Sequence, residues 1–194
     1  MGPMFLAAIP AYLLGSVSFG LLAARLFRLG DLRDIGSGNI GATNVLRTGN
    51  KAAALFTLIG DAAKGAIAVL LARWFLGEGA AGIAGLAAFA GHIWPCFAGF
   101  KGGKGVATFL GTLLALSFFS GLAACATWLL VARLGRISSL AALVTALLAP
   151  VYTMVFYHWH GAVVVALMAA LVFWTHRSNI ARLRSGTEPK IGQS

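Results

Sequence analysis

The sequence predicts an all-α polytopic membrane protein that forms a single domain over residues 1–194. Hydrophobic residues make up 59% of the chain and charged residues 10%, whereas a soluble domain carries about 25% charged residues. The apolar stretches are long and do not alternate with polar residues, which favours helices over a β-barrel. The net charge of +10 comes from basic residues between apolar segments, as the positive-inside rule describes. Nucleic acid is not indicated as a partner, because the chain has no basic-aromatic surface or groove-reading helix.

Seven apolar segments are predicted to be transmembrane helices. Runs of about 20 residues cross a bilayer, and the stretch from Val106 to Ala132 contains no charge. One long helix there would place Arg133 and Arg136 outside the cell, so two short crossings joined near Ser117–Gly121 fit the positive-inside rule better. The predicted segments are Met4–Ala24, Ala52–Phe75, Ala80–Phe97, Val106–Ser117, Phe119–Val131, Leu140–Tyr157 and Gly161–Thr175.

The basic residues that follow the first segment assign that loop to the cytoplasm. Seven crossings then put the N-terminus outside and the C-terminus in the cytoplasm. Polar sequence gathers in four cytoplasmic pieces, at residues 25–51, 98–105, 133–139 and 176–194. Within the last piece, we expect residues 185–194 to form a loose polar tail.

A first glycine-rich run, from Gly36 to Asn44, formally matches G-x-G-x-x-G. A dinucleotide site would need a preceding strand within a βαβ unit, which the surrounding sequence does not predict. A flexible turn explains one or two glycines, but not the hydroxyl, amide and basic residues beside them. We interpret the run as a phosphate-binding loop, because glycines let backbone N–H groups approach an anion. The candidate ligands are Ser37, Gly38, Asn39, Thr43, Asn44 and Arg47.

A second run, from Phe100 to Thr108, interleaves three glycines with two lysines. It is not a Walker A loop, because Lys104 is followed by Gly105. A basic loop that only fixes topology is the simpler interpretation. However, Lys104 opens a helix, and helix N-termini bind anions. The candidate phosphate ligands here are Lys101, Gly102, Gly103 and Lys104.

Two further polar clusters follow apolar segments on the same predicted side. Ser138 and Ser139 begin a helix, which predicts an N-cap, with a place in the site as a second role for Ser139. His176 and Asn179 share one helical face after the last segment. A histidine at a membrane edge is often only interfacial, but beside two phosphate-type loops we expect His176 to act as a ligand or proton carrier.

Asp61, Lys64 and His92 are ionisable residues that lie inside the predicted spans. Asp61 and Lys64 are spaced i,i+3, and we expect a mutual ion pair near the cytoplasmic end of their helix, with a functional role as the alternative. Pro95 should kink the helix that carries His92, and we expect His92 to bond either a freed backbone carbonyl or a neighbouring side chain.

Several kinds of catalytic site are missing from the sequence. The chain has no paired carboxylates that suit a metal, no G-x-S-x-G elbow and no histidine followed five residues later by aspartate. We therefore expect no metal and no cofactor.

Taken together, these runs resemble the bacterial integral-membrane acyl-phosphate:glycerol-3-phosphate acyltransferases over nearly the whole chain. The resemblance is carried by Gly36–Asn44, Gly91–Thr108, Arg136–Leu140 and His176–Arg182. It implies seven transmembrane helices in the bacterial inner membrane and an active site at the cytoplasmic face. It also implies acyl transfer from acyl phosphate to the 1-hydroxyl of glycerol 3-phosphate, without coenzyme A or acyl carrier protein. We expect a monomer.

On this interpretation Lys104, His176 and Ser37 are the catalytic residues, and the other candidates bind phosphate. Acyl phosphate is already activated, so holding the two substrates together would supply much of the acceleration. The base is either His176 or a phosphate oxygen of the donor. A transporter for a phosphorylated metabolite is the main alternative, although its site would be expected near the midplane of repeated halves. A lipid-phosphate phosphatase would need a nucleophile or metal ligands that the sequence lacks.

Overall fold

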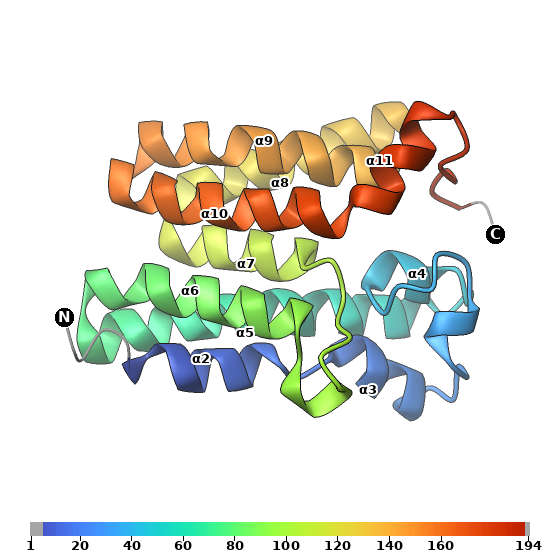
Figure 1. Cartoon of the computed structure of the whole chain (residues 1–194), viewed down its shortest axis with the longest axis horizontal. Helices are drawn as coiled ribbons and strands as arrows, with labels where there is room; N and C mark the ends of the chain where they lie inside the picture. The colour runs from blue at the N-terminus through green and yellow to red at the C-terminus, as the bar shows by residue number, and fades with distance from the viewer. Residues whose placement is uncertain (1–5, 193–194) are drawn as a thin grey trace.

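The computed structural model describes residues 6–192, and the regular elements of this part of the chain are all helices, with no β-strand. Long helices run roughly side by side, and several short ones lie at one end (Figure 1). The all-α prediction is confirmed. The elements are α2 (Ala8–Gly15), α3 (Phe19–Leu26), η1 (Leu32–Asp34), α4 (Ala42–Leu46), α5 (Lys51–Leu76), α6 (Glu78–Ile93), η2 (Cys96–Ala98), α7 (Val106–Leu116), α8 (Phe118–Gly135), α9 (Ser138–Phe156), α10 (Trp159–Thr175) and α11 (Arg177–Arg184).

Each of the seven predicted segments corresponds to a helix or a helix pair. Within residues 6–192, five are long and apolar enough to cross a membrane: Ala8–Leu26, Lys51–Leu76, Glu78–Ala98, Phe118–Gly135 and Ser138–Phe156. A sixth, α10, is followed by α11 at a bend of 61°. The seventh, α7, has only 11 residues, which is about 16 Å of helix. The predicted start of the first segment at Met4 lies outside the described residues.

The helices break where the local chemistry allows it. The first segment is divided at Ser16–Ser18, and the Ser18 hydroxyl caps α3 by accepting from the Leu21 N–H at 3.4 Å. Pro95 has no N–H to continue a helix, and α6 ends at Ile93 rather than at the predicted Phe97. The predicted break near Ser117–Gly121 is confirmed, because Ser117 is extended between α7 and α8.

Small residues let the helices approach closely, as is common in membrane bundles. A Cβ added at Gly15 would lie 2.0 Å from the Ala88 carbonyl oxygen, and one added at Gly111 would lie 2.0 Å from that of Ala62. Large apolar side chains point outward instead, including Leu129, which is 63% exposed. This arrangement leaves apolar side chains to face lipid, while the interior combines alanine and glycine with a smaller number of large side chains such as Phe89 and Phe109.

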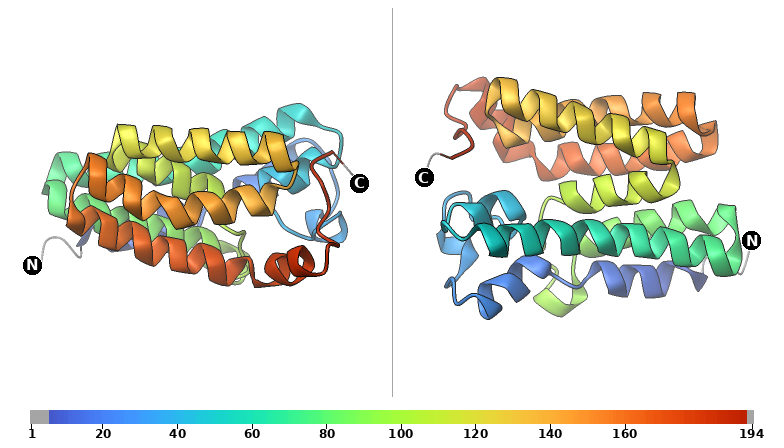
Figure 2. Two further views of the ribbon diagram at one scale, coloured as in Figure 1. Left: turned by 90° about the horizontal axis from the view of Figure 1, so that it is seen from above. Right: turned by 180° about the vertical axis from the view of Figure 1, so that it is seen from behind.

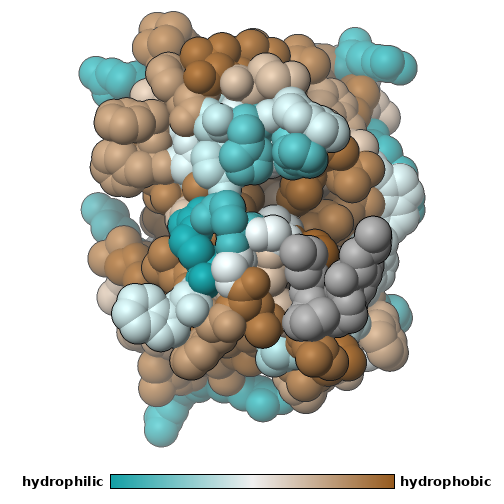
Figure 3. Space-filling view, turned by 90° about the vertical axis from the view of Figure 1, so that its left-hand side faces the viewer, coloured by the Kyte–Doolittle hydropathy of each residue, from teal (hydrophilic) through white to brown (hydrophobic). Residues whose placement is uncertain are grey.

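The end of the short helix α7 is covered by Arg73 of α5. The guanidinium donates to the carbonyl oxygens of Ala115 at 2.6 Å and Leu116 at 3.0 Å, and it pairs with Glu78 at 2.7 Å. Carbonyls freed at a helix end need such donors within a membrane. The bundle end that carries the N-terminus is mostly hydrophobic around its edge, with hydrophilic residues gathered near its middle (Figure 3).

The other end of the bundle gathers the polar loops. The helices α3, α4 and α11 and the C-terminus all lie there in each of the three views (Figures 1 and 2). The loop before α7 reaches further into the bundle, because Thr108 in the first turn of α7 donates to the Asp61 carbonyl oxygen at 2.8 Å. Asp61 lies well inside α5, so the two lysines of this loop sit below the polar end.

Two sequence predictions about this end are wrong in detail. Ser138 and Ser139 are the first two residues of α9, and neither caps it, because the cap position falls on Ile137. The expected loose tail is tied to the bundle up to residue 192, since the Ile191 N–H donates to the Arg136 carbonyl oxygen at 2.6 Å. Residues 193–194 of that tail lie outside the described residues.

Candidate active site

The first glycine-rich loop is organised by Asn44, whose side chain is buried at 1% exposure. Its Nδ2 donates to the Leu32 carbonyl oxygen at 2.9 Å, while its Oδ1 accepts from the Ser37 N–H at 3.1 Å and from the Arg47 guanidinium at 3.2 Å. Gly36 closes the turn with φ of +51°, and a Cβ there would lie 2.7 Å from Arg47 Cδ. Asn44 therefore holds Ser37 and Arg47 in place and is itself too buried to be an exposed ligand.

The glycines of the second loop shape it against the end of α6. The Gly102 N–H donates to the Ile93 carbonyl oxygen at 3.1 Å, and the Gly103 N–H donates to that of His92 at 3.2 Å. A Cβ added at Gly102 would lie 2.0 Å from the His92 carbonyl oxygen. Both N–H groups are thus engaged by backbone carbonyls of α6 in this conformation.

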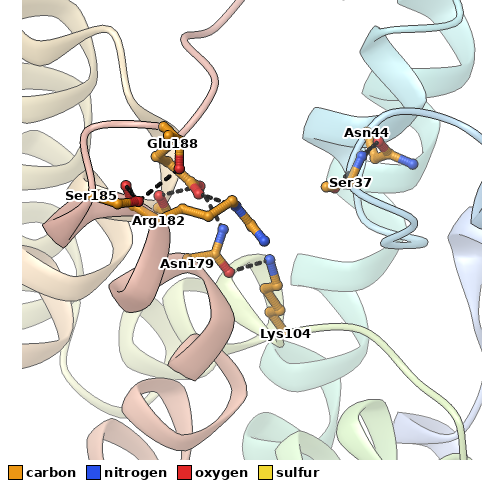
Figure 4. A network of polar contacts seen from close by, with 9 residues as sticks. Ser37, Asn44, Lys104, Asn179, Arg182, Ser185 and Glu188 are labelled. Carbon is orange, nitrogen blue, oxygen red and sulfur yellow. Dashed lines mark hydrogen bonds and ion pairs between the residues drawn. The ribbon is translucent and has the colours of Figure 1, made fainter.

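Lys104 is the cation at the centre of the site. Its Nζ donates to Asn179 Oδ1 of α11 at 2.6 Å, and its carbonyl oxygen accepts from the Thr175 hydroxyl at 3.3 Å. Figure 4 shows the Lys104 and Asn179 side chains directed toward each other, with Ser37 and Asn44 across from them. Burial lowers the pKa of Lys104 to about 8, against the opposing effect of Glu188.

Glu188 is a site residue that the sequence analysis missed. Its carboxylate accepts from Ser139 Oγ at 2.6 Å. It also accepts from Asn179 Nδ2 at 2.5 Å and from Arg182 Nε at 2.7 Å (Figure 4). Burial alone would raise the pKa of Glu188, but these three donors hold it below its ordinary value. One signal for Glu188 was available in the sequence, because the chain has only five acidic residues against 15 basic ones. A carboxylate in a basic tail is expected to have a partner.

Three cationic groups converge on this region. Arg182 and Arg47 each lower the pKa of Lys104 by repulsion, which places the charges from α4, the second loop and α11 within electrostatic reach of one another. Glu188 is the carboxylate that partly offsets them. An added anion would relieve the remaining repulsion, and guanidinium and ammonium groups together suit phosphate.

A cavity of about 430 Å³ lies between the two loops and the start of α11. Trp94 and Trp174 are paired beside it with ring centroids 5.5 Å apart, so one part of the cavity is polar and the other aromatic. The lining residues are Ser37, Gly38, Asn39, Ile93, Trp94, Phe100, Lys101, Gly102, Gly103, Lys104, Trp174, Thr175, Arg177 and Ser178. The structure thus brings seven of the predicted site residues to one cavity.

The other predicted site residues lie behind or beside the residues that line the cavity. Asn44 supports the first loop, and Asn179 links Lys104 to Glu188. Thr43 Oγ1 lies 3.2 Å from Ser138 Oγ, and the neighbouring Ser139 bonds Glu188. These contacts join α4, α9 and the C-terminal segment into one polar arc around the cavity.

His176 follows α10 and is 3% exposed. Its Nδ1 lies 2.8 Å from the Val172 carbonyl oxygen, an acceptor that requires a proton on Nδ1 and leaves Nε2 as the free acceptor of a neutral ring. Burial and the nearby Lys104 lower the pKa of His176 to about 4. A side chain with this pKa is neutral at pH 7 and is a weak base.

The fold and the site define an integral membrane protein with a basic, partly aromatic cavity near one end of its helix bundle. A model of the family "Glycerol-3-phosphate acyltransferase" matches residues 5–186. The chain therefore belongs to the glycerol-3-phosphate acyltransferase family, and it is an acyltransferase. The transporter interpretation is accordingly not favoured.

Relatives of the same description cover nearly the whole chain. One from Jannaschia sp. (strain CCS1) is 62% identical over 189 residues, covering 97% of this chain and 93% of the relative. One from Ruegeria sp. (strain TM1040) is 63% identical over 182 residues, covering 94% and 90%. Crystal structures of PlsY (YgiH), an integral membrane glycerol 3-phosphate acyltransferase, are also similar. The glycerol 3-phosphate form has a TM-score of 0.91 at 38% identity, covering 97% of this chain and 96% of that chain. The lysophosphatidic acid form has a TM-score of 0.88 at 36% identity, covering 97% and 95%.

Proposed function

We propose that this chain transfers a fatty acyl group from acyl phosphate to the 1-hydroxyl group of glycerol 3-phosphate. The products are 1-acylglycerol 3-phosphate and inorganic phosphate, the first step of phospholipid synthesis. The observation that carries the proposal is the convergence of Lys104, Arg47 and Arg182 on one region beside the cavity. Two phosphate groups repel each other, and a surplus of positive charge in the site offsets that repulsion.

In the proposed reaction the glycerol hydroxyl oxygen attacks the acyl carbonyl carbon. The bond between that carbon and the bridging phosphate oxygen breaks, and inorganic phosphate leaves with the electron pair. Lys104 stabilises the charge that develops on the leaving phosphate, while Ser37 and Arg47 orient a phosphate from the first loop. Acceleration then comes chiefly from positioning two substrates of which one is already activated.

The hydroxyl proton passes to a phosphate oxygen of the donor in this proposal. His176 has a pKa of about 4, which makes it a poor base at neutral pH. Its free Nε2 serves instead as a hydrogen-bond acceptor near Lys104. No metal, cofactor, coenzyme A or acyl carrier protein takes part.

The aromatic side of the cavity suits the acyl chain. Trp94 and Trp174 line it, and Phe100 beside them is 60% exposed. An acyl chain in the inner leaflet could reach these rings sideways between helices, while the polar substrate arrives from the water at the bundle end. We further propose a monomer in the bacterial inner membrane, with seven crossings, the N-terminus outside and the active site at the cytoplasmic face.

Purified protein incubated with labelled acyl phosphate and glycerol 3-phosphate tests the reaction. We expect labelled 1-acylglycerol 3-phosphate to form and phosphate to be released in equal amounts, with no product from acyl-coenzyme A. Phosphate release without acylated product would contradict the proposal and indicate a hydrolase.

Cysteines placed at positions 37, 101 and 178 test the orientation. In intact cells they should react only with a reagent that enters the cytoplasm. Labelling of position 101 by an impermeant external reagent would overturn the seven-crossing arrangement.

A further inference from the structure

A buried polar network lies beneath the active-site loops. It consists of Asp61 and Lys64 on α5 and His92 on α6, which are 3%, 1% and 6% exposed. Lys64 Nζ lies 2.9 Å from Asp61 Oδ1, and His92 Nδ1 lies 3.5 Å from the same oxygen. The predicted Asp61–Lys64 ion pair is therefore present, although it sits well inside α5 rather than at its cytoplasmic end. None of the three side chains lines the cavity.

Two members of this network, Lys64 and His92, contact other elements of the fold. Lys64 Nζ donates to the Val17 carbonyl oxygen at 2.8 Å, in the break between α2 and α3. The His92 ring lies under the second loop, since its Nε2 is 2.5 Å from the point that a Cβ of Gly103 would occupy. Asn39 of the first loop approaches the same point, with its Oδ1 at 3.5 Å. His92 thus stands where the two glycine-rich loops meet.

The energetics do not favour a purely stabilising role. A buried ion pair often contributes no more stability than apolar residues of similar volume, because desolvation offsets the attraction. Ionisable groups deep in a membrane bundle therefore mark function more often than stability. Here the only obvious structural need is a donor for the freed Val17 carbonyl, and that need does not explain Asp61 or His92.

We infer that Asp61, Lys64 and His92 form a positioning network that holds the second loop in the conformation that directs Lys104 at the substrate phosphates. The inference rests on the proposed function for its kinetic consequences. In this network the His92 ring packs beneath Gly103, the Asp61 carboxylate faces that ring at 3.5 Å, and Lys64 links Asp61 to the α2–α3 break.

Hydrogen exchange of the purified protein tests this independently of the reaction. His92→Gln should accelerate exchange in residues 99–105, where the Gly102 and Gly103 N–H groups are otherwise protected. Exchange in α8 and α9 should be unchanged. The matched control is Arg73→Met, which also removes an ion pair and two carbonyl contacts but at the other end of the bundle. It should leave exchange in residues 99–105 at the wild-type rate.

Kinetics supply the second readout. His92→Gln alone should lower kcat/KM at least about tenfold, yet it should lower it by less than about threefold when Lys104 is already alanine, because residues that act through one group are not additive. The inference would be overturned if the losses in kcat/KM from His92→Gln and Lys104→Ala multiplied in the double variant. It would also be overturned if residues 99–105 of His92→Gln exchanged at the wild-type rate. If His92→Gln does not fold, Asp61→Asn/Lys64→Met must give the same two results. If the wild-type protein failed to acylate glycerol 3-phosphate, the proposed function would be contradicted. The hydrogen-exchange result alone would then test whether the network positions the second loop.

Discussion

Lys104 Nζ and Asn179 Oδ1 are 2.6 Å apart although 75 residues separate them in the chain. This contact joins the loop before α7 to α11, and Asn179 also donates a hydrogen bond to Glu188 through its Nδ2. The amide therefore has a fixed orientation, with its oxygen toward the lysine and its nitrogen toward the carboxylate.

Removing a cation from the site should weaken catalysis strongly. Lys104→Ala and Arg47→Ala are each expected to lower kcat/KM at least about tenfold, the scale of a charge-assisted hydrogen bond of about 1.5–3 kcal/mol. Arg184→Ala is the control, because Arg184 is exposed at the end of α11 and should be nearly silent. Equal losses in all three variants would point to a general basic surface instead.

The depressed pKa of Lys104 predicts an alkaline limit to activity. Since burial lowers the pKa of Lys104 to about 8, the ammonium group loses its proton as pH rises through this value, and kcat/KM should fall with it. Lys104→Arg keeps a charge across that range, so the fall in kcat/KM should move to higher pH in this variant, whatever its absolute rate. If the fall stays at the same pH, a group other than Lys104 causes it. Spontaneous hydrolysis of acyl phosphate is subtracted from enzyme-free samples.

The two candidate bases are separated by substitution of His176. With a pKa of about 4, His176 stays neutral over most of the working range, so activity should not fall between about pH 7 and pH 5 by its protonation. If the donor phosphate takes the proton, His176→Gln should retain turnover within about tenfold and lose mainly apparent affinity. A hundredfold loss of turnover with intact substrate binding would identify His176 as the base.

Glycine substitutions should distinguish loop geometry from general folding. Gly36→Ala places a side chain at φ of +51° and against Arg47, and Gly103→Ala places one 2.5 Å from the His92 ring. Both, together with Gly38→Ala at φ of +66°, are expected to lower kcat/KM while the protein remains folded. Gly135→Ala is the control, since its Cβ would make only an ordinary contact at 3.6 Å. Wild-type kinetics in all three loop variants would remove the geometric argument.

The C-terminal segment should be held to the helix bundle less firmly in acid. Hydrogen bonds to the ionised form lower the pKa of Glu188, so its contribution is fully present above the ordinary glutamate pKa and is lost as pH falls through the lowered value. Limited proteolysis after Ser185 should therefore be slow at pH 7 and accelerate in acid. Glu188→Gln should be cleaved quickly at both pH values. A cleavage rate in this variant equal to that of wild type at pH 7 would show that the carboxylate does not hold the segment.

Much of the fold was predictable because hydrophobic length and charge act locally. The break at Ser117 followed from the positions of Arg133 and Arg136, although the run around it carries no charge. The N-cap at Ser138 was mispredicted because the cap position depends on the backbone of Ile137, which is extended. Such a one-residue shift leaves no signal in the sequence.

The site was predictable as a set of residues but not as a set of contacts. Glycines, lysines and amides marked both loops, yet the Gly102 and Gly103 N–H groups donate to the end of α6, which only the folded chain brings near. Glu188 lay in a segment whose polar composition suggested disorder. Its three partners come from α9 and α11, and no spacing along the chain relates it to Ser139.

The shortness of α7 decides where the two substrates meet. Its first turn lies level with Asp61, ten residues into α5, which is about 15 Å of helix. Lys104 is thus recessed into the thickness of the bundle instead of standing at its rim. In the proposed reaction the water-soluble substrate descends to this depth, and the acyl carbonyl stays near the level of the hydrocarbon. The lipid substrate then does not have to leave the bilayer, and the acylated product is released directly into the bilayer.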